Sequence, residues 1–232
     1  MTVSLKNLFT VAALSSLLAG ILLTLVQQFQ VIPAIIEAES YEQTSVAEHD
    51  GATHDTADGH VHDDTAWAPQ DGLQRTLFTA AANVVIALGF ALLIGAAVIL
   101  KGIKLNWRSG LLWGLAGYAV FFVAPSLGLH PELPGTEAAD FQLRQYWWLA
   151  TVACSATGLA LLVFNPRVVL KVLGLLLILI PHVAGAPQPD VHSALAPADL
   201  IQRFIIATII ANAIFWLALG GLYGFFHQKL VH

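Results

Sequence analysis

The residues with the clearest capacity for chemistry lie between Glu37 and Asp71, in a stretch without lysine or arginine. Four histidines are interspersed with aspartates there: His49, His54, His60 and His62, with Asp63 directly after the last. Neutral imidazole is a good ligand for cobalt, nickel, copper and zinc, and carboxylates add negative charge. A loop can fold His60 and His62 around a single ion. The pattern predicts a metal-attracting loop, and its irregular spacing defines no fixed coordination geometry.

Such a loop loses conformational entropy when it closes on an ion. Moderate affinity and quick exchange follow, which suit capture and delivery of a metal better than a permanent structural site. The alternative is an acidic loop that only keeps this part of the chain soluble.

The rest of the chain has the composition of a membrane protein. Its 232 residues are 57% apolar and 11% charged, with a mean hydropathy of +0.72, whereas soluble globular proteins are about 25% charged. The single cysteine, Cys154, excludes a disulfide framework and a cysteine-based zinc site. The ten basic residues are scattered, which argues against nucleic-acid binding. We expect one polytopic membrane domain over residues 1–232 with the loop 37–71 inserted in it.

Apolar runs place the membrane-spanning helices, since a span needs roughly 20 mainly apolar residues. Five runs qualify: Leu8–Phe29, Leu77–Leu100, Leu111–Leu127, Tyr146–Phe164 and Phe204–Phe226. A sixth, Val168–Ala186, contains Lys171 near its start and Pro181 near its end. The first run lacks an A-x-A cleavage site and ends in glutamines, so we interpret it as a retained helix rather than a signal peptide.

The charges favour six spans over the alternative of five. With six spans and a cytoplasmic start, seven basic residues lie inside, as the positive-inside rule requires. They are Lys6, Lys101, Lys104, Arg108, Arg167, Lys171 and Lys229. All fifteen acidic residues then lie outside, together with the loop. The prediction is an all-α protein of the bacterial cytoplasmic (inner) membrane with both termini in the cytoplasm.

The outer ends of the predicted helices carry a repeated pattern. Three helices begin with aspartate and arginine four residues apart: Asp71 and Arg75, Asp140 and Arg144, Asp199 and Arg203. The other three end at a proline: Pro33, Pro125 and Pro181. The pattern indicates three parallel two-helix hairpins, an architecture known among transporters, although aspartate caps and proline stops are also common by chance. Asn83 and Asn212 follow two of the arginines and are candidates for a pathway through the membrane.

A more fixed metal site is predicted where the three segments after the prolines converge. These segments supply Glu37 and Glu39, then His130, then His182. The alternative is that a lone histidine after a proline is only a boundary residue.

Motifs for enzymatic chemistry are absent from the sequence. It has no phosphate-binding glycine loop, no HExxH pair and no serine elbow, so we expect no enzyme. No acidic residue lies within an apolar run, which leaves a carboxylate proton relay without its usual residue. A divalent cation gains about 4.6 kcal/mol from 100 mV, on the order of a thousandfold inward accumulation. The membrane potential is therefore a sufficient energy source.

Several stretches together resemble the predicted cobalt transporter subunit CbtA of bacteria: LLAGILLTLVQQFQVIPAIIEAESYE, the His/Asp loop with WAPQDGLQRTLFT, GLLWGLAGYAVFFVAPSLGLHPELPG, AADFQLRQYWWLAT and LIPHVAGAPQP. The positions that carry the resemblance are Glu37, Glu39, Glu42, Asp71, Arg75, Pro125, Pro131, Pro134, Asp140, Arg144, Pro181 and His182. The resemblance implies cobalt uptake linked to cobalamin supply and a small one-helix partner, CbtB, with its own histidine motif. It also implies five spans.

We therefore expect a divalent metal uptake subunit that takes cobalt first, with nickel or zinc as alternatives, and that needs no organic cofactor. The other hypotheses are a non-transporting membrane partner that feeds or senses for another permease, and an intramembrane enzyme. The expected partners are the lipid bilayer, a CbtB-type subunit and further copies of the chain.

Overall fold

The computed structural model describes residues 5–50 and 69–231, and within them the secondary structure is helical apart from one isolated bridge between Thr136 and Ala194. The helices are α1 (Leu5–Gln30), α2 (Ile32–Asp50), α3 (Leu73–Lys101), α4 (Trp107–Tyr118), η1 (Ala119–Val123), α5 (Ala124–Ser126), α6 (Phe141–Phe164), α7 (Val168–Ala184) and α8 (Ala198–Leu230). Here η1 is a π-helical turn that joins α4 to α5.

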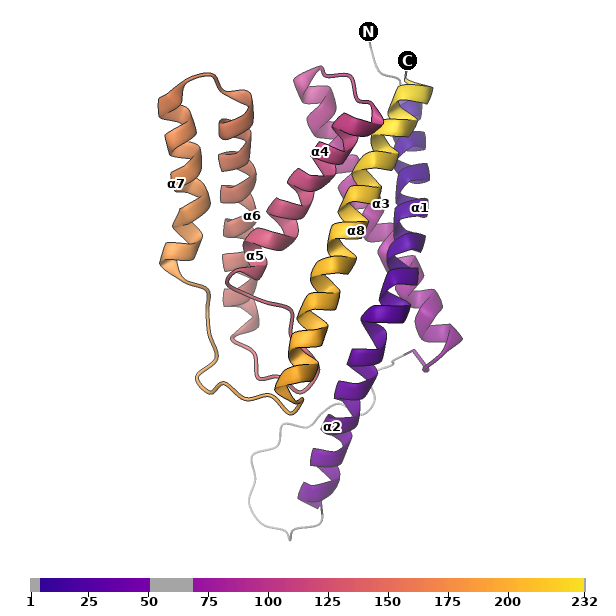
Figure 1. Cartoon of the computed structure of the whole chain (residues 1–232), viewed down its shortest axis with the longest axis vertical. Helices are drawn as coiled ribbons and strands as arrows, with labels where there is room; N and C mark the ends of the chain where they lie inside the picture. Colours follow the sequence, from indigo (N-terminus) through magenta and orange to yellow (C-terminus); the bar gives the residue numbers. More distant parts are fainter. Residues whose placement is uncertain (1–4, 51–68, 232) are drawn as a thin grey trace.

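In the part of the chain that the structure describes, five helices have the length and composition to cross a membrane, at the positions that the apolar runs predict. They are α1, α3, the continuous helix Trp107–Ser126, α6 and α8. The sixth run forms α7, an apolar helix of 17 residues. Its length is about 26 Å, slightly less than the roughly 30 Å of a bilayer's hydrocarbon core. It lies antiparallel beside α6 (Figure 1).

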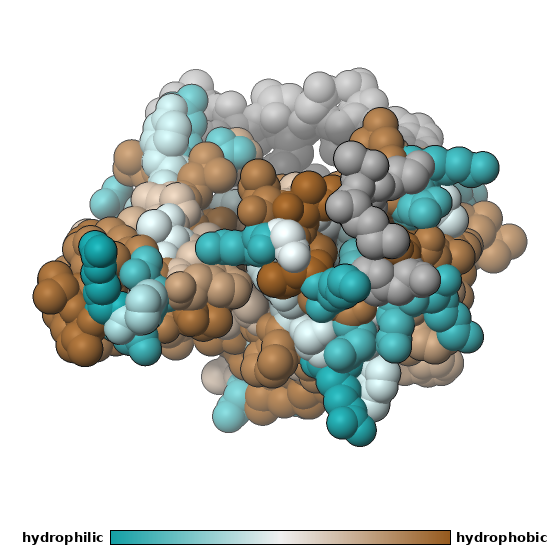
Figure 2. Space-filling model, turned by 90° about the horizontal axis from the view of Figure 1, so that it is seen from above, coloured by the Kyte–Doolittle hydropathy of each residue, from teal (hydrophilic) through white to brown (hydrophobic). Residues whose placement is uncertain are grey.

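The helix directions sort the charges between the two ends of the molecule. Both described chain ends lie at one end, which we call the basic end because the seven basic residues predicted to be inside are found there (Figure 1). Polar side chains gather on this end, and apolar ones cover the flanks around it (Figure 2). All acidic residues that the structure describes lie at the opposite, acidic end.

The predicted loop 37–71 begins differently from the expectation. As predicted, the first helix ends just before Pro33, since α1 stops at Gln30, but Pro33 itself lies in the first turn of a further helix, α2, which runs on to Asp50. The reason is that a proline in a first helical turn lacks only an N–H that would have no partner there. His49 therefore belongs to a helix, whereas His54, His60, His62 and Asp63 lie outside the described residues.

Pro125 and Pro181 lie inside the last helical turns rather than after them. Pro125 is part of α5, directly after the π-helical turn, and Pro181 precedes the end of α7 by three residues. Proline cannot donate to the carbonyl group one turn before it, and a π turn is one way in which a helix accommodates an irregular hydrogen-bond ladder. The prolines mark the outer ends within one turn.

Small residues determine which helices pack together. α8 packs against α4 and α1, α1 also packs against α3, and α6 packs against α7. A Cβ added at Gly114 would collide with the carbonyl oxygen of Trp216, and one added at Gly220 would collide with that of Gly110. Lipid supplies little hydrophobic drive for helix association, so close backbone approach at small residues selects the partners.

This packing differs from three equivalent hairpins. α1 and α3 pack as predicted, but α7 packs on α6 rather than on α8. The physical reason is again close approach: Gly158 of α6 and Gly174 of α7 each leave no room for a side chain beside the other's carbonyl oxygen. The α6–α7 pair meets the other helices mainly through η1 and α5.

Substitution of Gly114 by alanine is expected to destabilise the protein by about 1–3 kcal/mol, because the new methyl group pushes α4 away from the backbone of α8. The measurement is the apparent melting temperature of the purified chain in detergent. Gly89→Ala is the matched control, since a Cβ at that helical position meets nothing within 4 Å. Equal melting temperatures for the two variants would contradict this account of the α4–α8 contact.

Candidate functional site

The acidic end is organised by three arginines that bind carboxylates. Arg75 makes the strongest cluster: its two terminal nitrogens contact both carboxylate oxygens of Glu39, at 2.5 and 3.1 Å, and one of them also reaches Asp71 Oδ1 at 2.8 Å. The two parallel N–H···O bonds to Glu39 form a bidentate pair, which fixes geometry as well as charge. The cluster ties the start of α3 to α2.

The other two arginines repeat this contact with variations. Arg203 Nη2 lies 3.5 Å from Glu37 Oε1 and 3.4 Å from Asp199 Oδ2, in a more exposed position. Arg144 Nη2 donates to Glu132 Oε2 at 2.7 Å. Asp140 caps α6 by accepting from the backbone N–H of Leu143, so the aspartate–arginine pair predicted within one helix forms in two of the three cases.

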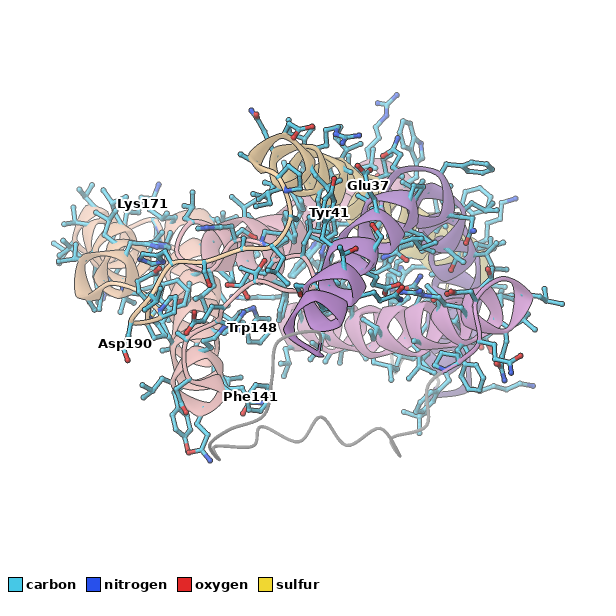
Figure 3. All side chains as sticks on the ribbon, turned by 90° about the horizontal axis from the view of Figure 1, so that it is seen from below. Glu37, Tyr41, Phe141, Trp148, Lys171 and Asp190 are labelled. Atoms are coloured by element: carbon cyan, nitrogen blue, oxygen red, sulfur yellow. The ribbon has the colours of Figure 1, made fainter. Side chains whose placement is uncertain are left out.

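Glu37 and Glu39, predicted as metal ligands, therefore have arginine partners in this structure. A carboxylate that is neutralised in this way attracts a cation less than a free one does. Seen from the acidic end, Glu37 lies on α2 well apart from Phe141 and Asp190 on the α6–α7 side (Figure 3). The segment after Pro125 approaches α2 where Gly135 lies beside Glu42. Neither Glu37 nor Glu39, however, lines the hollow that His130 and His182 share.

The candidate pathway residues Asn83 and Asn212 have different surroundings. Asn83 is buried between α3 and α1, where its amide donates to Thr24 Oγ1 at 3.0 Å and to Gln27 Oε1 at 2.7 Å. Asn212 donates to the carbonyl oxygen of Thr208 within its own helix. Asn83 thus links two helices through polar contacts, and a role for either residue in a pathway stays a prediction.

Two of the predicted metal ligands, His130 and His182, lie at the same hollow. They line one open hollow of about 440 Å³ at the acidic end of the α6–α7 pair, together with Leu127, Gly128, Trp147, Gly185, Ala186 and Gln188. Trp147 Nε1 donates to the carbonyl oxygen of Pro181 at 3.1 Å, and its ring lies edge-on to that of His182 with centroids 6.0 Å apart. Nε2 of His182 is buried and has no hydrogen-bond partner.

A second hollow, of about 250 Å³, adjoins the first and is lined by His130 and also by His192. It lies between the segments 128–139 and 187–194, which are joined by backbone hydrogen bonds from Glu137 N to Ser193 O and from Leu195 N to Gly135 O. Neither His192 nor Gln188 was selected as a site residue from the sequence. Both residues lie in the segment between α7 and α8, which carries no repeated sequence pattern that could have identified them.

Among the side chains that the structure describes, in residues 5–45 and 69–231, no three histidine, cysteine or acidic residues converge into a metal-binding group. The described part of the chain thus offers a pair of imidazoles rather than a complete coordination sphere. A two-ligand arrangement leaves most positions around an ion to water.

The family comparison matches almost the whole chain. Residues 5–228 fit the model of a family described as probable cobalt transporter subunit (CbtA). The chain belongs to this family. The resemblance predicted from the sequence is thereby confirmed, and the family indicates a cobalt transporter subunit. No curated protein and no solved structure matches the chain.

Replacing Arg75 by glutamine is expected to lower the free energy of unfolding by about 1–3 kcal/mol, because hydrogen bonds to charged groups are lost and two carboxylates remain close together. Arg203→Gln is the control and is expected to cost less than about 1 kcal/mol, since the side chain of Arg203 is 61% exposed against 25% for Arg75. Unfolding in a denaturing detergent, followed by circular dichroism, measures both. A larger loss for Arg203→Gln would refute the ranking.

Proposed function

We propose that this CbtA family member carries divalent metal ions inward across the bacterial cytoplasmic membrane, with cobalt as the first substrate and nickel or zinc as alternatives. The observation that carries the proposal is the sorting of charge along the helices: acidic residues and paired histidines at one end, basic residues at the other. Cations are attracted to the first end, and the basic residues orient the second toward the cytoplasm.

In the proposed topology α7 is a short sixth span, and both termini lie in the cytoplasm. The residues on either side of 51–68 belong to the acidic end, so the His/Asp-rich segment faces the outside. Its histidines bind ions from dilute solution, and quick exchange of each bound ion keeps the ion available for transfer. The hollow that His130 and His182 line lies at the same end.

The membrane potential drives the ion inward in this proposal. No carboxylate lies midway along the described helices, since their acidic residues gather at the acidic end. A coupled proton pathway therefore lacks the group that usually carries it. The potential alone supplies about 2.3 kcal/mol per charge per 100 mV.

A CbtB-type partner with a single helix is part of the proposal, and the packing supports a place for it. The α6–α7 pair touches the other helices mainly through η1 and α5, so both of its helices expose long apolar faces. These faces contact lipid or another helix. The rival function is that of a non-transporting metal-binding partner for another permease.

Uptake into proteoliposomes tests the proposal directly. Vesicles that contain the chain, alone or with a CbtB-type subunit, are expected to accumulate Co²⁺ when a potassium gradient and valinomycin set a negative interior. Accumulation should collapse when the potential is abolished, because no other driving force is present.

Vesicles without protein give the background leak. Absence of Co²⁺ and Ni²⁺ uptake under both conditions would remove transport and leave the rival function, which tight metal binding by the same preparation would then support.

Replacing His49, His54, His60 and His62 together by alanine is expected to raise the half-saturating Co²⁺ concentration more than it lowers the maximal flux. The reason is that a capture segment acts at low metal concentration and is bypassed at saturation. The matched control replaces Thr44, Thr53, Thr56 and Thr65 in the same segment by alanine. An equal loss of flux at saturating metal would instead make the histidines an obligatory part of the pathway.

A further inference from the structure

The hollow at the acidic end of the α6–α7 pair brings two histidines from distant parts of the chain together. His130 follows α5, and His182 lies in the last turn of α7. Trp147 of α6 holds the end of α7 through its hydrogen bond to the carbonyl oxygen of Pro181. Each histidine is thus positioned by a different helix end, and Trp147 of α6 lines the hollow with them.

The electrostatics of the hollow favour a cation. Two helices end beside it: the continuous helix Trp107–Ser126 and α7, whose following residues Leu127, Gly128 and Gly185 are part of the lining. The last carbonyl groups of a helix carry a partial negative charge, which stabilises positive charge nearby. Both helix ends therefore favour a cation in the hollow.

The donor atoms favour a borderline transition cation over calcium or magnesium. The lining contains two imidazoles and the amide of Gln188 but no carboxylate. In the adjoining hollow Glu132 is bound to Arg144, and Glu137 accepts from Ser193 Oγ. Imidazole nitrogen suits cobalt, nickel, copper and zinc, whereas calcium and magnesium prefer oxygen ligands.

His182 supplies an independent indication of a ligand. Its Nε2 is buried without a hydrogen-bond partner, whereas buried polar atoms in proteins nearly always have one. A buried polar atom without a partner needs an explanation, and one explanation is that the atom binds a ligand. Trp147, its aromatic neighbour, is engaged elsewhere through its own N–H.

We propose that this hollow binds one divalent transition cation through His130 and His182, with water and the amide oxygen of Gln188 completing its shell. None of the residues that line this hollow belongs to the His/Asp-rich segment of the sequence, and none is an arginine. Two imidazoles and one neutral amide give modest affinity and rapid release, which suit a site that an ion occupies only briefly during transport. This physiological role rests on the proposed function, whereas the binding itself does not.

Binding is tested in the full chain with His49, His54, His60 and His62 replaced by alanine, so that the loop does not mask the hollow. Calorimetric titration with Co²⁺ is expected to show one site. His130→Gln and His182→Gln should each weaken it by at least about tenfold, because each removes a metal ligand. His192→Gln is the matched control and should change the affinity less than threefold, since His192 lines only the adjoining hollow.

Pulsed electron paramagnetic resonance with Cu²⁺ as the probe counts the coordinated imidazoles directly, before either histidine of the hollow is replaced. Two coordinated imidazoles in the loop-substituted chain, and one after His182→Gln, support the site. One or none in the loop-substituted chain overturns it, as does unchanged Co²⁺ affinity in both variants.

The same preparations separate this site from transport. Loss of binding in the two variants, together with no uptake by any preparation, retains the site and removes the transport function. The converse result is that the loop-substituted chain takes up Co²⁺ while neither His130→Gln nor His182→Gln alters its Co²⁺ affinity. That result retains transport and removes the site.

Discussion

The structure depends most on the close approach of helix backbones at glycine. In lipid, apolar side chains gain little by leaving their surroundings, so shape complementarity and polar contacts decide which helices associate. α8 meets α4 where Gly110 and Gly114 face Gly220 and Gly224, and it meets α1 on another side. It thereby becomes the central helix, around which α1, α3 and α4 assemble. The α6–α7 contact at Gly158 and Gly174 is a second, separate instance.

This separation explains how the acidic end is divided. Around the central helices, arginines at the starts of α3 and α8 bind the glutamates of α2. Around the α6–α7 pair, Arg144 binds Glu132, and two histidines face a hollow. The first region contains the bidentate ion pair of Arg75 with Glu39, and the second contains imidazole nitrogens beside a hollow. The metal site that we propose lies in the second region.

The sequence predicted the features that depend on periodicity and composition. Apolar runs located the long helices, and the pattern of aspartate and arginine identified side chains that do make ion pairs. It did not predict the helical start of the loop, because proline both ends helices and begins them. Nor did it reveal that α7 packs on α6, since this choice depends on which glycines face each other in space.

For the candidate site, the sequence supplied the residues but not their grouping. His130 and His182 were predicted as ligands and share a hollow, whereas Glu37 and Glu39 face arginines at another place. The prediction of a common vestibule assumed three equivalent hairpins. Because the hairpins are not equivalent, residues at matching positions of the pattern need not lie close together in space.

The joint at η1 and α5 has a mechanical consequence. α6 and α7 pack chiefly on each other and meet the other helices mainly at this joint. The pair could therefore tilt as one unit about a hinge that lies beside the hollow. His182 belongs to α7 and would move with the pair, while His130 belongs to the segment that follows α5. In the proposed metal site, a small tilt of the α6–α7 pair would change the separation of the two imidazoles, so the affinity for an ion would depend on the angle of these two helices.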